Sequence, residues 1–516
     1  MTSTPLAPDH DRRWLVLAIC CLSLLLVSMD VTIVNVALPS IHRDLDASLG
    51  ELQWVLDAYS LVIACLLMLS GSMADRLGRK RVFIVGLVVF TAGSALCAAA
   101  PSLELLIAAR VLQAIGGSML NPVAMSIIRN VFHDPKERAQ AIGMWGAVIG
   151  ISAALGPVLG GVLVDGPGWR YVFLINVPIG IAALGLTARY VPESRAAKAR
   201  RVDPVGQVLV IVCLATLVYG IIEGNGHGWA SAEILGCFAV AIASAAALVA
   251  YERRRIEPLI ETRFFRSIPF SGATVAALCA FAGLGGFLFL GTLYLQSARG
   301  YSALEAGLFS LPTALMMLLL APLSGRIVGS RGARWPMVLA GVCLTVGPLL
   351  LVGLSLETPV ALLLTAFLLR GAGMGLANPP ISTAAISGMP ADQAGVAGGI
   401  ASTARQVGFA LGVAIVGAAT GAGGGDGLGP SFAAATHPGW LILAGLGVAV
   451  LVLGLVTTTP RALASAAALE GVLENDAPGR AGPGDGASTP PAPATAATAA
   501  GPPATAPASP FRPPAP

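Results

Sequence analysis

Residues 71–81 read GSMADRLGRKR, a short polar stretch between two long apolar runs. It places one acid, Asp75, among four basic residues, with Gly71 and Gly78 on either side of the acid. Glycine adopts the backbone conformations that a tight turn requires. Each flanking run is long enough to cross a bilayer, since a transmembrane helix needs about 20 mostly apolar residues. The stretch therefore predicts a tight turn between two transmembrane helices.

The whole chain is strongly apolar. Hydrophobic residues make up 55% of its 516 residues, charged residues make up 11%, and the mean hydropathy is +0.79. Soluble proteins carry about 25% charged residues, so this composition excludes a soluble globular protein. All eight cysteines lie in apolar runs without the spacing of metal ligands, and we therefore expect no metal site.

Reading the apolar runs in order predicts fourteen transmembrane helices. Basic residues concentrate in cytoplasmic turns and so test this count. With both termini cytoplasmic, 25 of the 31 Lys and Arg residues fall on the cytoplasmic side. The other six are Arg43, Arg170 and Arg299 in outer turns and Arg110, Arg370 and Arg405 within spans. The predicted spans lie near residues 14–38, 51–72, 82–100, 103–128, 139–164, 170–190, 204–224, 230–250, 269–296, 303–325, 335–356, 359–387, 394–420 and 440–459.

Two basic stretches, at residues 195–201 and 251–266, divide these spans into groups of six, two and six. We expect an N-terminal six-helix bundle at 1–201, two additional helices with a cytoplasmic linker at 202–268, and a C-terminal six-helix bundle at 269–459. Residues 460–516 end in a stretch of mainly Pro, Ala, Gly, Ser and Thr. This composition offers little apolar surface to bury, which predicts a disordered cytoplasmic tail.

Five charged residues lie inside predicted spans, where each costs about 2.5–3.5 kcal/mol on insertion scales and is a candidate functional residue. Helical rise places Asp30 and Arg110 at about the same depth in the outer half of the membrane. They can neutralise one another, and an acid that loses its partner can carry a proton. Asp57 can recognise a cationic substrate. The others are Arg370 and Arg405.

Each of these charges also has a purely structural interpretation. Asp30 and Arg110 can form a static pair that fixes helix packing. Asp57 can simply be hydrated near the outer end of its helix. Arg370 and Arg405 can be held by backbone carbonyls.

The stretch at 71–81 closely resembles the signature loop of the major facilitator superfamily. The resemblance implies that Asp75, Arg76 and Arg79 form a cytoplasmic latch that stabilises the outward-open state, with Gly71 and Gly78 shaping the loop. The corresponding turn of the second half, residues 325–334, has glycine in place of the acid. That departure implies a weak or absent latch in the second half, while the internal repeat itself is typical of secondary transporters.

Four further motifs, together with the fourteen spans, resemble the drug:proton antiporter family with fourteen transmembrane segments. The first span carries Asp30 and Asn35. The fourth carries Arg110 and Gln113 in a segment that is similar to the family's proton-transfer motif. The fifth resembles a motif of antiporters, and the thirteenth contains TARQVG at 403–408. The residues concerned are Gly156, Pro157, Gly160 and Gly161 in the fifth span and Arg405 and Gln406 in the thirteenth.

The resemblance implies an all-α polytopic membrane protein with two six-helix bundles, the major facilitator fold, plus two extra helices between them. It also implies alternating access, with small lipophilic drugs or antibiotics exported in exchange for protons. The sequence has no GxxxxGK[ST] phosphate-binding loop, which excludes ATP as the driver. We therefore expect no cofactor beyond the proton gradient.

The expected partners are a small-molecule substrate, protons and the lipid bilayer, with no nucleic acid, and the expected state is a monomer. Only three of the basic residues are lysine, which is typical of a high-G+C bacterial genome and favours a bacterial inner membrane. A major facilitator importer or symporter of a small solute is the alternative function. A membrane enzyme is disfavoured, because the five histidines are scattered over both sides of the membrane. No residue names the substrate.

Overall fold

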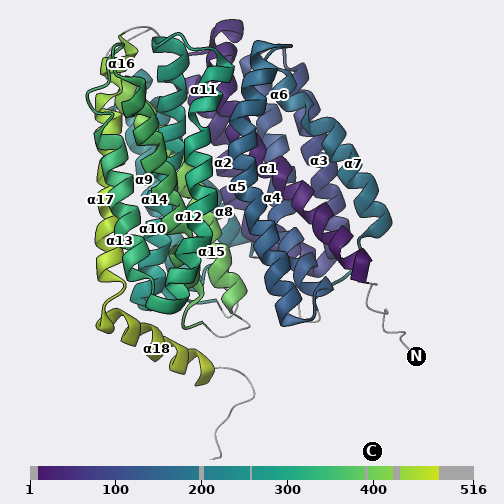
Figure 1. The fold of residues 1–516 in the computed structure, drawn as a ribbon. Helices are drawn as coiled ribbons and strands as arrows, with labels where there is room; N and C mark the ends of the chain where they lie inside the picture. The colour runs from purple at the N-terminus through teal and green to yellow at the C-terminus, as the bar shows by residue number, and fades with distance from the viewer. Residues whose placement is uncertain (1–9, 197–202, 256–257, 390–392, 422–430, 476–516) are drawn as a thin grey trace, which may run out of the picture.

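The computed structural model describes residues 10–196, 203–255, 258–389, 393–421 and 431–475. This part of the chain is a bundle of long helices without strands (Figure 1). The first nine helices are α1 (His10–Leu45), α2 (Leu49–Leu77), α3 (Arg79–Ala99), α4 (Leu103–Val131), α5 (Pro135–Asp165), α6 (Tyr171–Leu174), α7 (Asn176–Tyr190), α8 (Pro204–His227) and α9 (Ala232–Glu252).

The second part of the bundle follows a 3₁₀ turn, η1 (Thr262–Arg266). One of its elements, η2 (Tyr294–Ala298), is a turn of π-helix that continues α10. The helices are α10 (Ile268–Leu293), α11 (Ala303–Phe309), α12 (Leu311–Arg331), α13 (Arg334–Leu349), α14 (Val360–Ile386), α15 (Ala394–Gly421), α16 (Phe432–Ala435), α17 (His437–Val456) and α18 (Pro460–Asn475).

Thirteen helical segments of the described residues are long and apolar enough to cross a membrane. The predicted span at 335–356 corresponds to α13, which has 16 residues and is shorter than the about 20 that a crossing needs. Two predicted single spans are each built from two helices in series, α6 with α7 and α11 with α12. The all-helical class predicted from the sequence is therefore confirmed, and thirteen of the fourteen predicted crossings correspond to helices that are long and apolar enough.

The turn predicted at residues 71–81 is present and occupies a single residue. Helix α2 ends at Leu77 and α3 begins at Arg79, with Gly78 between them at a φ of 112°. Residues other than glycine rarely adopt this backbone conformation. At its other end α2 starts with a capping box, in which Ser48 and Glu51 bond to one another's backbone amides.

Two groups of helices make up the bundle, as Figure 1 shows. In the first, α1 packs against α4, α5 and α7, and α3 packs against α4 and α7. In the second, α10 packs against α14, α15 and α17, while α13 packs against α14 and α17. The groups meet where α2 packs against α15 and where α5 packs against α11 and α12. Helix α8 packs against α9 and contacts both α2 and α15.

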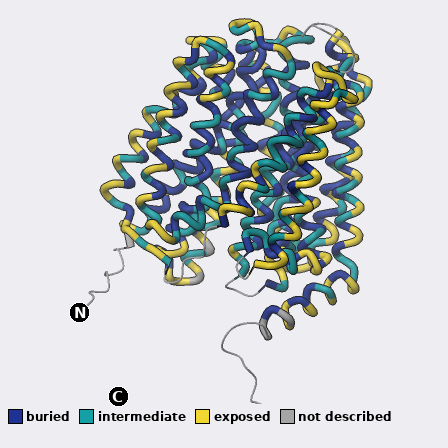
Figure 2. Tube along the Cα trace, turned by 180° about the vertical axis from the view of Figure 1, so that it is seen from behind, coloured by how far each residue is buried: buried dark blue, intermediate teal, exposed yellow. Residues whose placement is uncertain are grey.

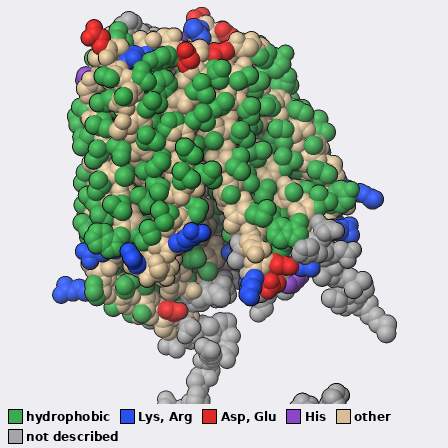
Figure 3. Space-filling view, viewed as in Figure 1, with side chains coloured by type: hydrophobic (Ala, Val, Ile, Leu, Met, Phe, Trp, Pro, Cys, Tyr) green, Lys and Arg blue, Asp and Glu red, His purple; other side chains and the backbone are tan. Residues whose placement is uncertain are grey.

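The outer surface of the bundle is apolar, as expected for a protein that faces hydrocarbon. Buried positions lie between helices and exposed ones on the outside (Figure 2). Among the exposed side chains are Ile242 (71% exposed), Ile181 (59%) and Leu319 (57%). Hydrophobic side chains cover most of the face in Figure 3, and Lys and Arg gather mainly at one end. We call the end where these Lys and Arg residues gather the basic end. Helix α1 begins at this end.

The prediction of a disordered tail from residue 460 is wrong for residues 460–475, which form α18. The Pro-rich composition that motivated the prediction starts only after this segment, and 460–475 is rich in Ala and Leu. Leu469 and Leu473 bury their side chains with Phe264 and Phe270. The Ser465 hydroxyl also accepts a hydrogen bond from the Ile268 amide at 3.0 Å. Residues 476–516 lie outside the described part of the chain.

Candidate functional site

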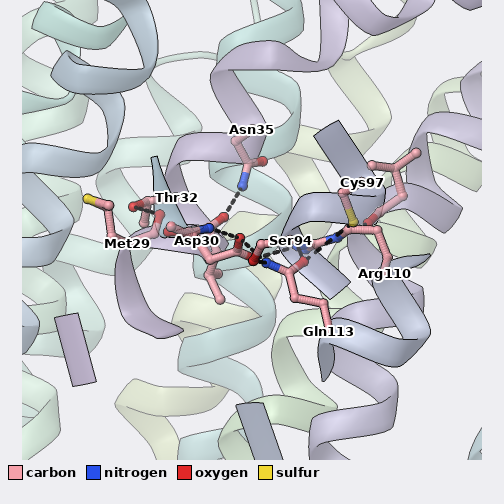
Figure 4. Close-up of polar contacts among 11 residues, drawn as sticks. Met29, Asp30, Thr32, Asn35, Ser94, Cys97, Arg110 and Gln113 are labelled. Atoms are coloured by element: carbon pink, nitrogen blue, oxygen red, sulfur yellow. Dashed lines mark hydrogen bonds and ion pairs between the residues drawn. The ribbon is translucent and has the colours of Figure 1, made fainter. Parts of the chain in front are cut away.

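A buried polar network surrounds Asp30 of α1 (Figure 4). Arg110 of α4 forms an ion pair with the Oδ2 atom of Asp30. The amide nitrogens of Gln113 and Asn176 donate to Oδ1 at 2.7 and 3.1 Å. Asp30 is 0% exposed and Arg110 is 1% exposed. Three helices, α1, α4 and α7, thus hold one carboxylate with three donors.

Gln113 connects this carboxylate to further polar groups on α3 and α4. Its Nε2 also donates to the Ser94 hydroxyl of α3 at 2.8 Å, and its Oε1 accepts from Arg110 at 2.7 Å. The Cys97 thiol lies 3.8 Å from the same Oε1 atom. Because Gln113 donates to the acid and accepts from the base, it fixes the relative position of both.

Arg110 has partners beyond Asp30 as well. Its Nε donates to the Val55 carbonyl of α2 at 3.1 Å. Its guanidinium lies 4.1 Å from the centre of the Tyr59 ring and 5.7 Å from that of Phe173. A cation is attracted to the face of an aromatic ring, and more so when it is removed from water. Arg110 is therefore held in place by contacts that do not depend on the charge of Asp30.

The sequence predicts the pairing of Asp30 with Arg110 but not all members of the network. Ser94, Tyr59 and Asn176 enter it only because α3, α2 and α7 close around α1 and α4. An amide in the middle of an apolar run, such as Asn176, is the signal that can identify such a member. Asn35, in contrast, lies apart from the acid (Figure 4). Its Nδ2 donates to the Val31 carbonyl of its own helix at 2.8 Å.

Asp57 of α2 is 0% exposed, and neither of its carboxylate oxygens has a hydrogen-bond partner within the described residues. The structure therefore places Asp57 among buried side chains, whereas its structural interpretation expects contact with water near the helix end. Gln53, one turn away on the same face, donates to the carbonyls of Val413 and Ala414 on α15 at 3.0 and 2.9 Å. Asp57 thus lies on the α2 face toward α15, where the two helix groups meet.

Two arginines of the second group, the buried Arg370 and the half-buried Arg405, have different partners. Arg370 of α14 donates from Nη2 to the Ala280 carbonyl at 2.9 Å and lies 5.8 Å from the Phe287 ring, so a backbone carbonyl holds it, in agreement with its structural interpretation. Arg405 of α15 instead donates to side-chain oxygens, those of Asn378 at 3.2 Å and Ser382 at 3.3 Å. Its neighbour Gln406 is half-buried.

The loop at 71–81 is held by an ion pair and by a segment distant in the sequence. Asp75 accepts from Arg79 at 2.9 Å across Gly78, while Arg76 is exposed. The carboxylate of Glu193 accepts from the Lys80 amide at 3.2 Å, and Arg79 donates its amide to the Ser194 carbonyl at 2.9 Å. The sequence does not predict the contact of Glu193 with the loop, because Glu193 follows α7 and lies more than 100 positions away.

The glycine motif of α5 makes close helix contacts on two sides. A Cβ atom at Gly156 would overlap the Thr32 side chain of α1, and one at Gly161 would overlap the backbone of Leu304 in α11. The Pro157 carbonyl lies directly against Gly307 of α11. Glycine allows such close backbone approach. The motif therefore packs α5 against its own group through α1 and against the other group through α11.

Gly160 provides a direct test of this packing. A Cβ atom there would lie 2.9 Å from Ile33 Cγ1 and 3.1 Å from the Ile33 carbonyl oxygen. Gly160→Ala is expected to lower stability by about 1–3 kcal/mol, because overpacking forces the helices apart. The melting temperature of the purified protein should fall. Gly185→Ala in α7, where a Cβ meets open space, is the matched control and should leave it equal or higher.

Comparison with known proteins identifies the family. Residues 20–413 match the family model described as the Major Facilitator Superfamily. The chain belongs to this superfamily.

Within the part that the structure describes, no three His, Cys, Asp or Glu residues form a group that could hold a metal ion.

Several curated relatives are named for drug resistance or export. The multidrug resistance protein Stp of Mycobacterium tuberculosis is 39% identical over 396 residues, which cover 77% of this chain and 74% of the relative. The tetracenomycin C resistance and export protein of Streptomyces glaucescens is 38% identical over 419 residues, covering 80% and 77%. The multidrug efflux pump LfrA of Mycolicibacterium smegmatis is 36% identical over 407 residues, covering 79% and 80%.

Solved structures share the fold at low identity. A bacterial homologue of the lysosomal transporter Spinster, in an inward-facing conformation, matches with a TM-score of 0.60 and 19% identity over 91% of this chain and 99% of that one. A peptide transporter in complex with sulfate matches with a TM-score of 0.63 and 15% identity over 87% and 95%. The family resemblance inferred from the sequence is therefore confirmed, and the protein is a multi-pass transporter of the bacterial inner membrane.

Proposed function

We propose that this protein exports small lipophilic molecules, drugs or antibiotics, in exchange for protons by alternating access. The observation that carries the proposal is the buried carboxylate of Asp30 with its three donors. A carboxylate in the membrane interior is costly and marks ion or proton pathways in transporters. The relatives named for multidrug resistance and efflux support the direction of transport.

The network supplies a way to couple a proton to a conformational change. A proton that binds Asp30 removes the charge attraction to Arg110. Arg110 keeps its contacts with Val55 and Tyr59, so it stays in place while α1 is released from α4. One charge that crosses 100 mV is worth about 2.3 kcal/mol, which sustains a substrate gradient of roughly 40-fold. The mechanism therefore needs no cofactor.

Asp57 is the proposed recognition residue for cationic substrates. A buried carboxylate without hydrogen-bond donors attracts a positive group that enters its surroundings. It lies on the α2 face toward α15, between the two groups that alternating access moves. The alternative role of Asp57 is that of a second proton-binding acid. Asp57→Asn assays with a cationic and a neutral substrate distinguish the two roles.

We also propose fourteen crossings with both termini and the basic end in the cytoplasm. The distribution of Lys and Arg supports this orientation. Helix α13 would be the remaining crossing, because it packs between α14 and α17 inside the bundle. Its 16 residues extend about 24 Å at the rise of an α-helix. The proposed bundles are then 1–201 and 269–459, with α8 and α9 as the pair inserted between them at 202–268.

The test is efflux from an exporter-deficient bacterium that expresses the protein, with a panel of lipophilic cations and antibiotics. We expect expression to lower accumulation and a protonophore to abolish the effect. Efflux that survives the protonophore would contradict proton coupling. Uptake of a solute by the membrane-inserted protein would favour the importer or symporter instead.

A further inference from the structure

The hydrogen bonds around Asp30 suit its ionised form. Both carboxylate oxygens face donors: Oδ2 faces Arg110, and Oδ1 faces the amide nitrogens of Gln113 and Asn176. An ionised carboxylate only accepts hydrogen bonds, whereas a protonated one also carries an O–H donor. A proton on either oxygen would therefore point at another donor. The protonated acid needs an acceptor that the ionised acid does not use.

Two of the three residues that donate to Asp30 have no acceptor to offer. The guanidinium of Arg110 has no acceptor atom. Gln113 Oε1 accepts from Arg110 at 2.7 Å and lies 3.8 Å from the Cys97 sulfur, which engages both of its lone pairs. Asn176 differs, because its side chain is 0% exposed and its Oδ1 has no hydrogen-bond partner within the described residues. A buried acceptor without a partner is rare in native proteins and calls for a reason.

The other groups around Asp30 do not provide this acceptor. Three titratable side chains interact with Asp30, from α4, α2 and α3: Arg110, Tyr59 and Cys97. The Tyr59 hydroxyl also lacks a partner, but it lies 3.2 Å from the Cβ position of Gly117, two turns from Arg110 on α4. At the level of Asp30, α5 presents Gly156 and α7 presents Asn176, and neither titrates.

A carboxylic acid and a carboxamide complement one another. The acid donates its O–H to the amide oxygen, while the amide donates an N–H to the acid's carbonyl oxygen. Asn176 already supplies the N–H, 3.1 Å from Asp30 Oδ1. Protonation of Oδ2 and a turn of the carboxyl group about its Cβ–Cγ bond bring the new O–H to the unpartnered amide oxygen.

Arg110 keeps other partners when Asp30 turns away. Its guanidinium still donates to Gln113 Oε1 and to the Val55 carbonyl, and it still lies over the Tyr59 ring. Asn176 is the first residue of α7 and follows the break between α6 and α7. The pair of bonds to Asn176 therefore attaches α1 to the start of α7.

We propose that Asn176 binds Asp30 in both protonation states, as a donor to the carboxylate and as the acceptor of the O–H of the acid. The proton comes from water, the new O–H bond forms on Asp30, and Arg110 keeps its own proton. Asn176 is thus a positioning residue that shifts the bonding of α1 from α4 toward α7 when Asp30 is protonated. This inference rests on the proton coupling at Asp30 in the proposed function.

Infrared difference spectra of the purified protein at high and low pH test this role without transport. The acid carbonyl band of Asp30 is the one that Asp30→Asn removes. In Asn176→Leu this band should move to higher frequency, because the acid loses its hydrogen bonds to the amide. It should also appear at a pH lower by about one unit, since the buried O–H has no acceptor. The ionised form loses less, because Gln113 still donates to Oδ1 at 2.7 Å.

Asn35→Leu is the matched control. It removes an amide that is also buried, but whose nitrogen bonds to its own helix. The Asp30 band should keep its frequency and its pH midpoint in this variant. Asn176→Ala, which adds no bulk, should shift the band as Asn176→Leu does and serves if the leucine variant does not fold.

The outcomes separate this inference from the proposed function. An Asp30 band with the same frequency and midpoint in the wild type and in both Asn176 variants would overturn the role of Asn176 alone. The absence of any Asp30 band at low pH would overturn it together with the role of Asp30. The expected shifts in a protein that exports nothing would keep the role of Asn176 and contradict the export function.

Discussion

Asp30→Asn is expected to abolish protonophore-sensitive efflux and to lower the stability of the protein. Asparagine keeps the shape of the side chain but cannot exchange a proton, so the coupling step is lost. It also leaves the Arg110 guanidinium buried without its counter-charge. Removal of one partner from a buried ion pair costs about 3–5 kcal/mol. Efflux in cells and the melting temperature in detergent measure the two effects separately.

A double substitution separates the two causes. Asp30→Asn with Arg110→Gln removes both charges and should recover part of the melting temperature without recovering efflux. Glu104→Gln, at the exposed start of α4, is the matched carboxylate control and should transport as wild type does. Protonophore-sensitive efflux by the Asp30→Asn protein would contradict the assignment of Asp30 as the coupling acid.

Asp57→Asn is expected to lower the export of cations without lowering the stability of the protein. Export of a lipophilic cation such as tetraphenylphosphonium should fall at least about tenfold, which corresponds to about 1.4 kcal/mol of lost attraction. The melting temperature should stay equal or rise, since the carboxylate has no hydrogen-bond partner to lose. Parallel assays with a cationic and a neutral substrate on the same protein make the comparison.

The pattern of loss identifies the role of Asp57. Loss of the cation alone assigns it to substrate recognition. Equal loss of cationic and neutral substrates, with protonophore sensitivity gone, assigns it to proton coupling. Unchanged export of both would exclude either role and leave Asp57 as a structural residue.

The sequence predicts those features that depend on local chemistry. The single-residue turn at Gly78 follows from glycine between two apolar runs, and helical rise alone places Asp30 and Arg110 at one depth. Features that depend on which helices meet were not predicted. Asn176 and Ser94 join the network, and Glu193 joins the loop, only through contacts between distant segments.

Helix α18 is another feature that the sequence does not predict, because it also depends on contacts between distant segments. Its small apolar side chains resemble the composition of the following tail, and burial of Leu469 and Leu473 depends on a surface that other helices build. The predicted tail, which begins at residue 460, therefore includes a segment with its own packing partners. The sequence alone predicts how deep a residue lies in the membrane and where a turn forms. It does not predict the surface against which a distant segment packs.

The different partners of Arg110 and Arg370 have a consequence for the response to voltage. Arg110 faces a carboxylate, so the first group of helices carries no net charge at that point. Arg370 is held by a carbonyl and an aromatic ring, so the second group carries a buried positive charge. Any movement of α14 along the membrane normal displaces this charge through the electric field, which acts with about 2.3 kcal/mol per charge and 100 mV. In the proposed alternating access, we therefore expect the resting potential to favour one arrangement of the second group over the other before substrate or proton has bound.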